Sequence, residues 1–167
     1  MFHYYNPSAI GTSGNDDIYS WDQTVNPYGR DKIEEYKIKT LSARKYGGTL
    51  SWLAAEGEDN EQTDGIAASE AIKKLDYFAS SETPFFLAVG FFRPHTPFVA
   101  PKEYFDFYDR KKIEIPEVSN EYLATLPEPA VKSIRAKKNQ LNLEKELAQE
   151  IKEAYYSTIS FVDAQVG

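Results

Sequence analysis

The sequence predicts an α/β protein built on part of a doubly wound sheet with flanking helices. Three features predict this class: an apolar stripe of helical period between residues 63 and 79, an uncharged apolar run at Pro84–Phe92, and a longer helical stripe from Leu143 to Val166. A helix followed by a strand buried on both faces is the half-unit from which doubly wound sheets are built. Because a single such strand is evident, we expect fewer strands than in a complete domain.

Composition and charge narrow the classes of function. The 167 residues are 41% hydrophobic and 14% aromatic, as in folded rather than disordered chains. A net charge of −7 argues against a nucleic-acid partner. The sequence has no cysteine, which excludes disulfides, thiolate metal sites and a cysteine nucleophile. It shows neither an apolar stretch of membrane-spanning length nor a signal peptide, so the residues leave the compartment open.

The first part of the chain is rich in turn formers. Residues 1–30 are expected to form a long irregular loop, in which Asp16 and Asp17 are better explained as a polar turn than as a cation site. Two β-like runs, Tyr36–Leu41 and Thr49–Leu53, then predict a ribbon.

The remaining elements follow from periodicity and capping. Thr63 or Asp64 is expected to cap a helix that ends near Ala79. Further along the chain we expect a short helix at 101–108, an edge strand at 113–115, a brief turn at 120–123, a weakly helical basic piece at 130–138 and a long helix at 143–166. The basic piece is interpreted as a solvated face rather than a polyanion site.

The best candidate for chemistry is the segment Arg93–Pro97, which follows the predicted strand. Its two prolines stiffen a loop at the carboxyl end of that strand, where ligands bind in open α/β sheets. His95 on such a loop could donate to an oxyanion or protonate a leaving group, although a structural histidine is the alternative. Arg93 could bind an anion or form a structural ion pair. No metal ligands are assigned.

At these residues the sequence resembles the sulfatases of the alkaline-phosphatase superfamily, and the iduronate sulfatase branch in particular. The resemblance rests on FFLAVGFFRPHTPFVAPKEYFDFY from Phe85, on AYYSTISFVDAQVG from Ala154, and on Met1–His3, which is similar to the end of the family's GK-x-FH motif. It implies a sheet of alkaline-phosphatase type and a sulfuric ester hydrolase acting on sulfated carbohydrate or another sulfate ester. His95 would be catalytic, and His3 and Arg93 would bind the substrate.

The same resemblance implies cofactors that this chain does not supply. Sulfatases use Ca²⁺ and a formylglycine made from the first residue of C/S-x-P-x-R, and the sequence has no cysteine and no serine two residues before a proline. We therefore expect residues 1–167 to be an internal fragment of a catalytic domain, inactive alone, with a loop-rich part at 1–62 and a helix–strand–helix part at 63–167. By family, the compartment would be periplasmic or secreted.

Three other readings stay open. The chain could be a non-catalytic module that binds sulfated glycans, a phosphate-ester hydrolase of the same superfamily, or a truncated product without activity. A sheet cut short exposes its edges, through which copies could self-associate.

Overall fold

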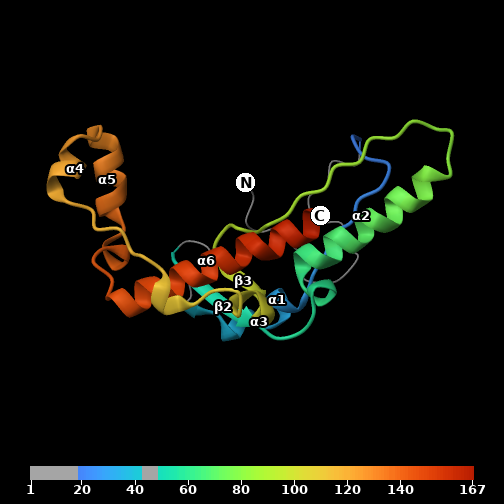
Figure 1. Cartoon of the computed structure of the whole chain (residues 1–167). Coiled ribbons are helices and arrows are strands. Elements are labelled where there is room, and N and C mark those ends of the chain that lie inside the picture. The colour runs from blue at the N-terminus through green and yellow to red at the C-terminus, as the bar shows by residue number, and fades with distance from the viewer. Residues whose placement is uncertain (1–18, 43–48) are drawn as a thin grey trace.

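The computed structural model describes residues 19–42 and 49–167, and it forms a mixed α/β structure around a small sheet (Figure 1). The strands are β1 (Lys39–Thr40), β2 (Ser51–Ala55) and β3 (Phe98–Pro101). The helices are α1 (Arg30–Ile33), α2 (Thr63–Ala79), α3 (Lys102–Phe105), α4 (Asn120–Ala124), α5 (Glu128–Ala136) and α6 (Lys145–Val166). Single 3₁₀ turns occupy Glu35–Lys37, Asp59–Glu61, Arg110–Lys112 and Lys138–Gln140. Among the described helices, none is long and apolar enough to cross a bilayer.

The sheet has the order β1-β2-β3. β1 pairs antiparallel with β2, which confirms the predicted ribbon in a shorter form, and β2 pairs parallel with β3 through the register Trp52↔Phe98 to Ala55↔Pro101. β3 was not predicted. This mixed sheet places the described part of the chain in the α/β class.

The period-two alternation of the strands divides the core into two faces. Trp52 and Phe98 point to one face and pack against Ile151 and Ala154 of α6. Val99 points to the other face, where it packs with Ile38 and Ala55. Helix α6 therefore lies across one side of the sheet, as Figure 1 shows.

The two long helices were predicted from their apolar stripes, and both are present. α2 ends at Ala79 as expected, but it begins at Thr63 with Gln62 as its N-cap residue, so the predicted cap at Thr63 or Asp64 is wrong. α6 begins two residues after the predicted start. The buried face of α6 differs from the prediction near its end, because Phe161 is buried whereas Ile159 and Val166 are exposed. On α2 the stripe is covered only near the first turn, and Ile72 is 60% exposed.

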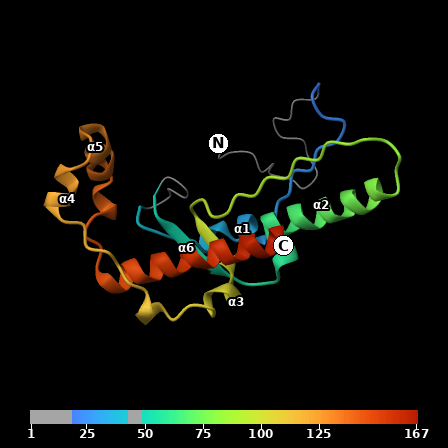
Figure 2. The ribbon, with the colours of Figure 1, turned by 45° about the horizontal axis from the view of Figure 1, so that its top comes forward.

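The predicted buried strand at Pro84–Phe92 is wrong. The segment is extended but belongs to no strand, and Phe86 is 79% exposed. It runs back from the far end of α2 toward the sheet (Figures 1 and 2). Near its start, Phe85 stacks on Phe78 with the ring centroids 4.6 Å apart. A doubly buried strand needs strands beside it and layers above and below, and the described residues place none there.

The predicted edge strand at Ile113–Ile115 is also wrong. Ile113 is buried against α6, and its carbonyl accepts a hydrogen bond of 2.9 Å from the Gln149 side chain rather than from a strand. The basic piece is helical as expected and forms α5, which lies with α4 at the opposite end of the molecule from the tip of α2 (Figure 2). Its Lys132 is exposed and pairs with Glu128 on the same helix.

Candidate functional site

The proline-braced segment forms a bend that leads directly into β3. The backbone N–H of His95 donates to the carbonyl of Phe92 at 2.9 Å, which closes the turn. The hydroxyl of Thr96 donates to the carbonyl of Thr49 at 3.1 Å and lies 3.3 Å from the hydroxyl of Ser51. The bend is therefore tied to the start of β2 on one limb.

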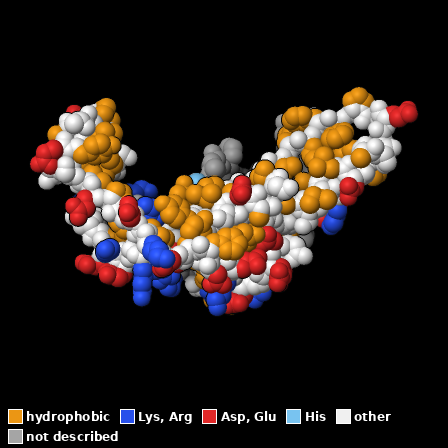
Figure 3. Space-filling model, viewed as in Figure 1, with side chains coloured by type: hydrophobic (Ala, Val, Ile, Leu, Met, Phe, Trp, Pro, Cys, Tyr) orange, Lys and Arg blue, Asp and Glu red, His pale blue; other side chains and the backbone are white. Residues whose placement is uncertain are grey.

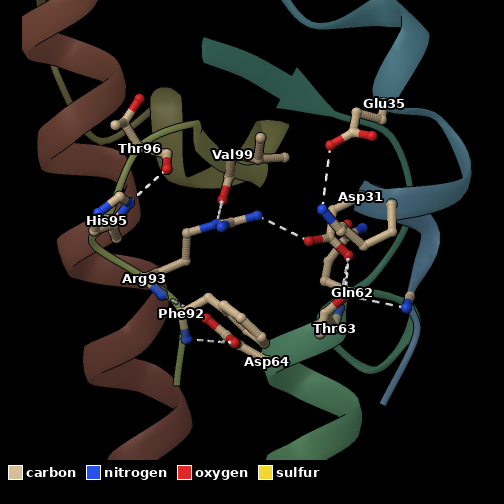
Figure 4. A network of polar contacts seen from close by, with 12 residues as sticks. Asp31, Glu35, Gln62, Thr63, Asp64, Phe92, Arg93, His95, Thr96 and Val99 are labelled. Atoms are coloured by element: carbon tan, nitrogen blue, oxygen red, sulfur yellow. Dashed lines mark hydrogen bonds and ion pairs between the residues drawn. The ribbon is translucent and has the colours of Figure 1, made fainter. Parts of the chain in front are cut away.

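Asp64 ties the other limb to the first turn of α2. Its two carboxylate oxygens accept the backbone N–H groups of Phe92 and Arg93, both at 2.9 Å (Figure 4). Asp64 is 2% exposed, and burial raises the pKa of its carboxyl group while the nearby Arg93 opposes that rise. The sequence predicted Asp64 only as a possible cap, whereas the structure uses its side chain to hold a loop 28 residues away.

Arg93 is buried in an ion pair. One terminal nitrogen lies 2.8 Å from a carboxylate oxygen of Asp31 on α1, and Nε donates to the carbonyl of Val99 at 2.8 Å. The side chains of Arg93 and Asp31 are 8% and 5% exposed. The geometry favours the ion-pair alternative for Arg93, and a role in binding substrate stays a prediction.

Asp31 is a site residue that the sequence did not reveal. Its second oxygen accepts both the backbone N–H and the hydroxyl of Thr63, at 2.8 and 2.6 Å. The Thr63 hydroxyl in turn accepts the N–H of Gly29 at 3.0 Å. Asp31 lies in a polar stretch with no motif around it, so only the tertiary contacts identify it.

His95 lies on the bend with its ring half-buried. Nδ1 is 2.6 Å from the carbonyl oxygen of Thr96. A carbonyl can only accept, so Nδ1 carries the hydrogen of this contact. Figure 4 shows the imidazole and the Arg93 guanidinium leaving the bend in different directions, with the guanidinium directed at Asp31. His3, Asp16 and Asp17 lie outside the described residues.

The described residues do not fit a calcium ion. Within the ranges 19–42 and 49–167, no group of three or more His, Cys, Asp or Glu residues lies close enough together to hold a metal ion. The two carboxylates nearest the bend, Asp31 and Asp64, already accept N–H and O–H donors, whereas Ca²⁺ needs six to eight oxygen ligands.

Comparison with known proteins shows which proteins this chain is related to. No protein-family profile matches the chain. A sulfatase of Formosa agariphila is 28% identical over 178 residues, which cover 100% of this chain and 33% of that protein. An arylsulfatase of Clostridium perfringens is 36% identical over 119 residues, or 70% of this chain and 24% of that protein. The iduronate 2-sulfatase of Mus musculus is 24% identical over 176 residues, or 98% and 32%. The chain is a relative of the sulfatases.

This sulfatase relative spans about a third or less of the length of the curated relatives it matches. The comparisons confirm the resemblance found in the motifs, including that to the iduronate sulfatases. The small mixed sheet is consistent with that relationship and, taken alone, gives the α/β class.

Proposed function

We propose that this chain is part of a sulfuric ester hydrolase, similar to the iduronate sulfatases, that acts on sulfated carbohydrate. His95 would contact the sulfate ester and serve its leaving group, and His3 would be a second sulfate contact. The observation that carries this proposal is the placement of His95 on a bend held at both limbs by partly buried hydrogen bonds. A histidine held in this way meets an anion without first losing conformational freedom.

The chemistry assigned to His95 follows from its tautomer. With Nδ1 donating to the Thr96 carbonyl, protonation places a second hydrogen on Nε2. That hydrogen can bond to the ester oxygen and pass to the departing alkoxide as the sulfur–oxygen bond breaks. Nucleophile and metal are assigned to no residue of this chain, so we propose that the 167 residues alone do not hydrolyse sulfate esters.

The proposal includes an architecture. Residues 1–167 would form an internal part of a catalytic domain whose complete sheet is doubly wound and of alkaline-phosphatase type, with parts at 1–62 and 63–167. The lengths of the matched relatives support this, because the chain corresponds to about a third of the Formosa and mouse proteins.

Activity and sulfate binding test the proposal together. We expect no turnover of 4-methylumbelliferyl sulfate by the chain with added Ca²⁺. In an NMR titration with sodium sulfate, the His95 ring signals should shift, with a dissociation constant on the order of millimolar or weaker. His95→Gln should remove the response, and His3→Gln should weaken it. Sodium chloride at matched ionic strength is the control.

Three outcomes would overturn parts of this proposal. Calcium-dependent turnover would contradict the inactivity of the isolated chain. A sulfate response that His95→Gln leaves unchanged would remove the assigned role of His95. Sub-micromolar binding of heparin fragments would instead favour a glycan-binding module.

We also propose that isolated copies of the chain self-associate through the exposed apolar segment 84–92. Phe85, Phe86 and Val89 are 48%, 79% and 44% exposed, and apolar side chains gather at this end of the molecule in Figure 3. Uncharged, extended, β-prone segments pair readily with other chains. We propose this contact in addition to the exposed sheet edges expected from the sequence.

Sedimentation velocity at increasing protein concentration measures this association. We expect the wild-type chain to sediment faster as its concentration rises and Phe86→Lys to shift the distribution toward monomer. Val118→Lys adds the same charge at a position that is 59% exposed outside the segment, and it should associate like the wild type. Equal behaviour of the two variants would exclude the segment as the contact.

A further inference from the structure

We infer that Asp31 and Asp64 are positioning residues for His95, acting together through Arg93 and the backbone of the bend. The inference rests on the proposed function of His95. It adds two carboxylates, from α1 and from the first turn of α2, that touch no reacting atom and decide where the imidazole lies (Figure 4).

Asp64 fixes the entry to the bend. Its two oxygens hold consecutive N–H groups, those of Phe92 and Arg93, so this peptide unit is held at two points. The N–H of His95 then bonds back to the carbonyl of Phe92. Because prolines fix only local φ angles, the orientation of the bend relative to the core depends on the carboxylate.

Asp31 fixes the guanidinium that closes the bend. Arg93 is the first residue of the bend, and its Nε donates to the carbonyl of Val99 in β3, which follows the last residue of the bend. The two limbs are therefore joined by one side chain, with His95 between them. Asp31 holds the terminal nitrogen of that side chain at 2.8 Å and keeps it directed across the bend.

Thr63 connects the two carboxylates. Its N–H and hydroxyl both donate to Asp31, and Asp64 is the next residue on α2. A shift of the start of α2 would move both carboxylates, and with them both limbs of the bend. The set holds two carboxylates and one guanidinium, so the charge of Arg93 is already compensated inside the protein.

The test compares a positioning effect with a purely structural one. Asp64→Asn keeps the shape of the side chain and replaces one acceptor by a donor that faces a backbone N–H. We expect the ring ¹⁵N shifts to lose the Nδ1–H signature and the sulfate affinity of His95 to fall about tenfold, as for one lost hydrogen bond to a charged group. Phe161→Leu, on the buried face of α6, should lower the urea midpoint and leave both the ring shifts and the sulfate affinity unchanged.

The outcomes separate the inference from the proposed function. If sulfate does not shift the His95 ring signals in the wild type, the proposed function is wrong. The ¹⁵N shifts of the ring still report its tautomer, so they test the positioning role on their own. If Asp64→Asn does not fold, Thr63→Val keeps both carboxylates, and it should produce a smaller change of the same kind. Unchanged ring shifts in the folded Asp64 or Thr63 variant, or equal changes in Phe161→Leu, would overturn the inference.

Discussion

Replacing Gly65 by alanine is expected to prevent the chain from folding stably. A Cβ at this position would lie 1.8 Å from the carbonyl oxygen of Asp59 and 2.4 Å from the carbon of the same group. Both atoms are backbone, so no side-chain rotation relieves the overlap, and α2 would have to move away from the preceding turn. We expect a loss of more than about 4 kcal/mol in the free energy of unfolding.

The displaced turn holds other parts of the fold. The Asp59 carboxylate accepts the hydroxyl of Tyr104 at 2.6 Å and the side-chain amide of Gln165 at 2.7 Å, which joins α3 and the end of α6 to the start of α2. Burial and the hydrogen bond to the Asp59 carboxylate raise the pKa of Tyr104 above its ordinary value, so the phenol remains a donor also in alkaline solution. The clash at Gly65 therefore acts on three helices.

Urea unfolding followed by circular dichroism measures this effect. Gly90→Ala is the matched control, because in the described part of the chain no atom apart from those of Gly90 and its two chain neighbours lies within 4 Å of a Cβ built there. It should change the stability by no more than about 0.5 to 1 kcal/mol, with any gain due to a less flexible unfolded chain. Similar urea midpoints for Gly65→Ala and Gly90→Ala would show that the turn at Asp59–Glu61 can move to accommodate the Cβ at little cost in stability.

The sequence pattern predicted the two long helices well, because the apolar period that marks a helix is carried by residues close together in the chain. The apolar period identified α2 and α6 together with most of their bounds. Burial depends on what packs against each face, which is why Ile72 and Ile159 are exposed despite lying on predicted apolar stripes. Periodicity gives the face of a helix but not its partner.

The strands show the opposite behaviour. The run at 84–92 has the composition of a buried strand, but a strand requires a hydrogen-bonding neighbour, and composition does not supply one. β3 was missed because residues 98–100 were assigned to no element and Pro101 was expected to begin a helix. Its pairing with β2 is a long-range property that no local signal reports.

For the site, the sequence identified the bend and His95, but not what holds them. The prolines and the position after an apolar run pointed to the bend. Asp31 and Asp64 reach it from 62 and 28 residues away, and neither spacing is a motif. Contacts between distant segments of this kind require the tertiary structure.

Removing the positive charge of Arg93 should cause the second large loss of stability. Arg93→Met is expected to lower the stability at neutral pH by about 3 to 5 kcal/mol, because Asp31 and Asp64 would remain buried without their counter-charge. Arg93 opposes the rise that burial imposes on the pKa of Asp64, so its loss should raise that pKa further.

The direction of the pH dependence follows from this shift. A carboxyl group whose pKa is higher in the folded than in the unfolded chain stabilises the fold below its ordinary pKa of 3.8, and this contribution is lost as the pH rises through the folded pKa. The variant should therefore recover part of its stability on acidification, and the difference from the wild type should narrow as the pH falls toward about 4.5.

Urea midpoints of the wild type and of Arg93→Met, measured at neutral and acidic pH, show whether the difference in stability becomes smaller. The double variant Arg93→Met with Asp64→Asn removes the titrating carboxyl group, so its loss of stability relative to the wild type should change less with pH than that of Arg93→Met alone. A deficit below about 1 kcal/mol that does not vary with pH would mean that the two carboxylates are satisfied by their N–H and O–H donors without Arg93. In that case the guanidinium of Arg93 would not be needed for the stability of the fold. The predicted role of Arg93 in binding an anion would then be the better explanation for its position on the bend.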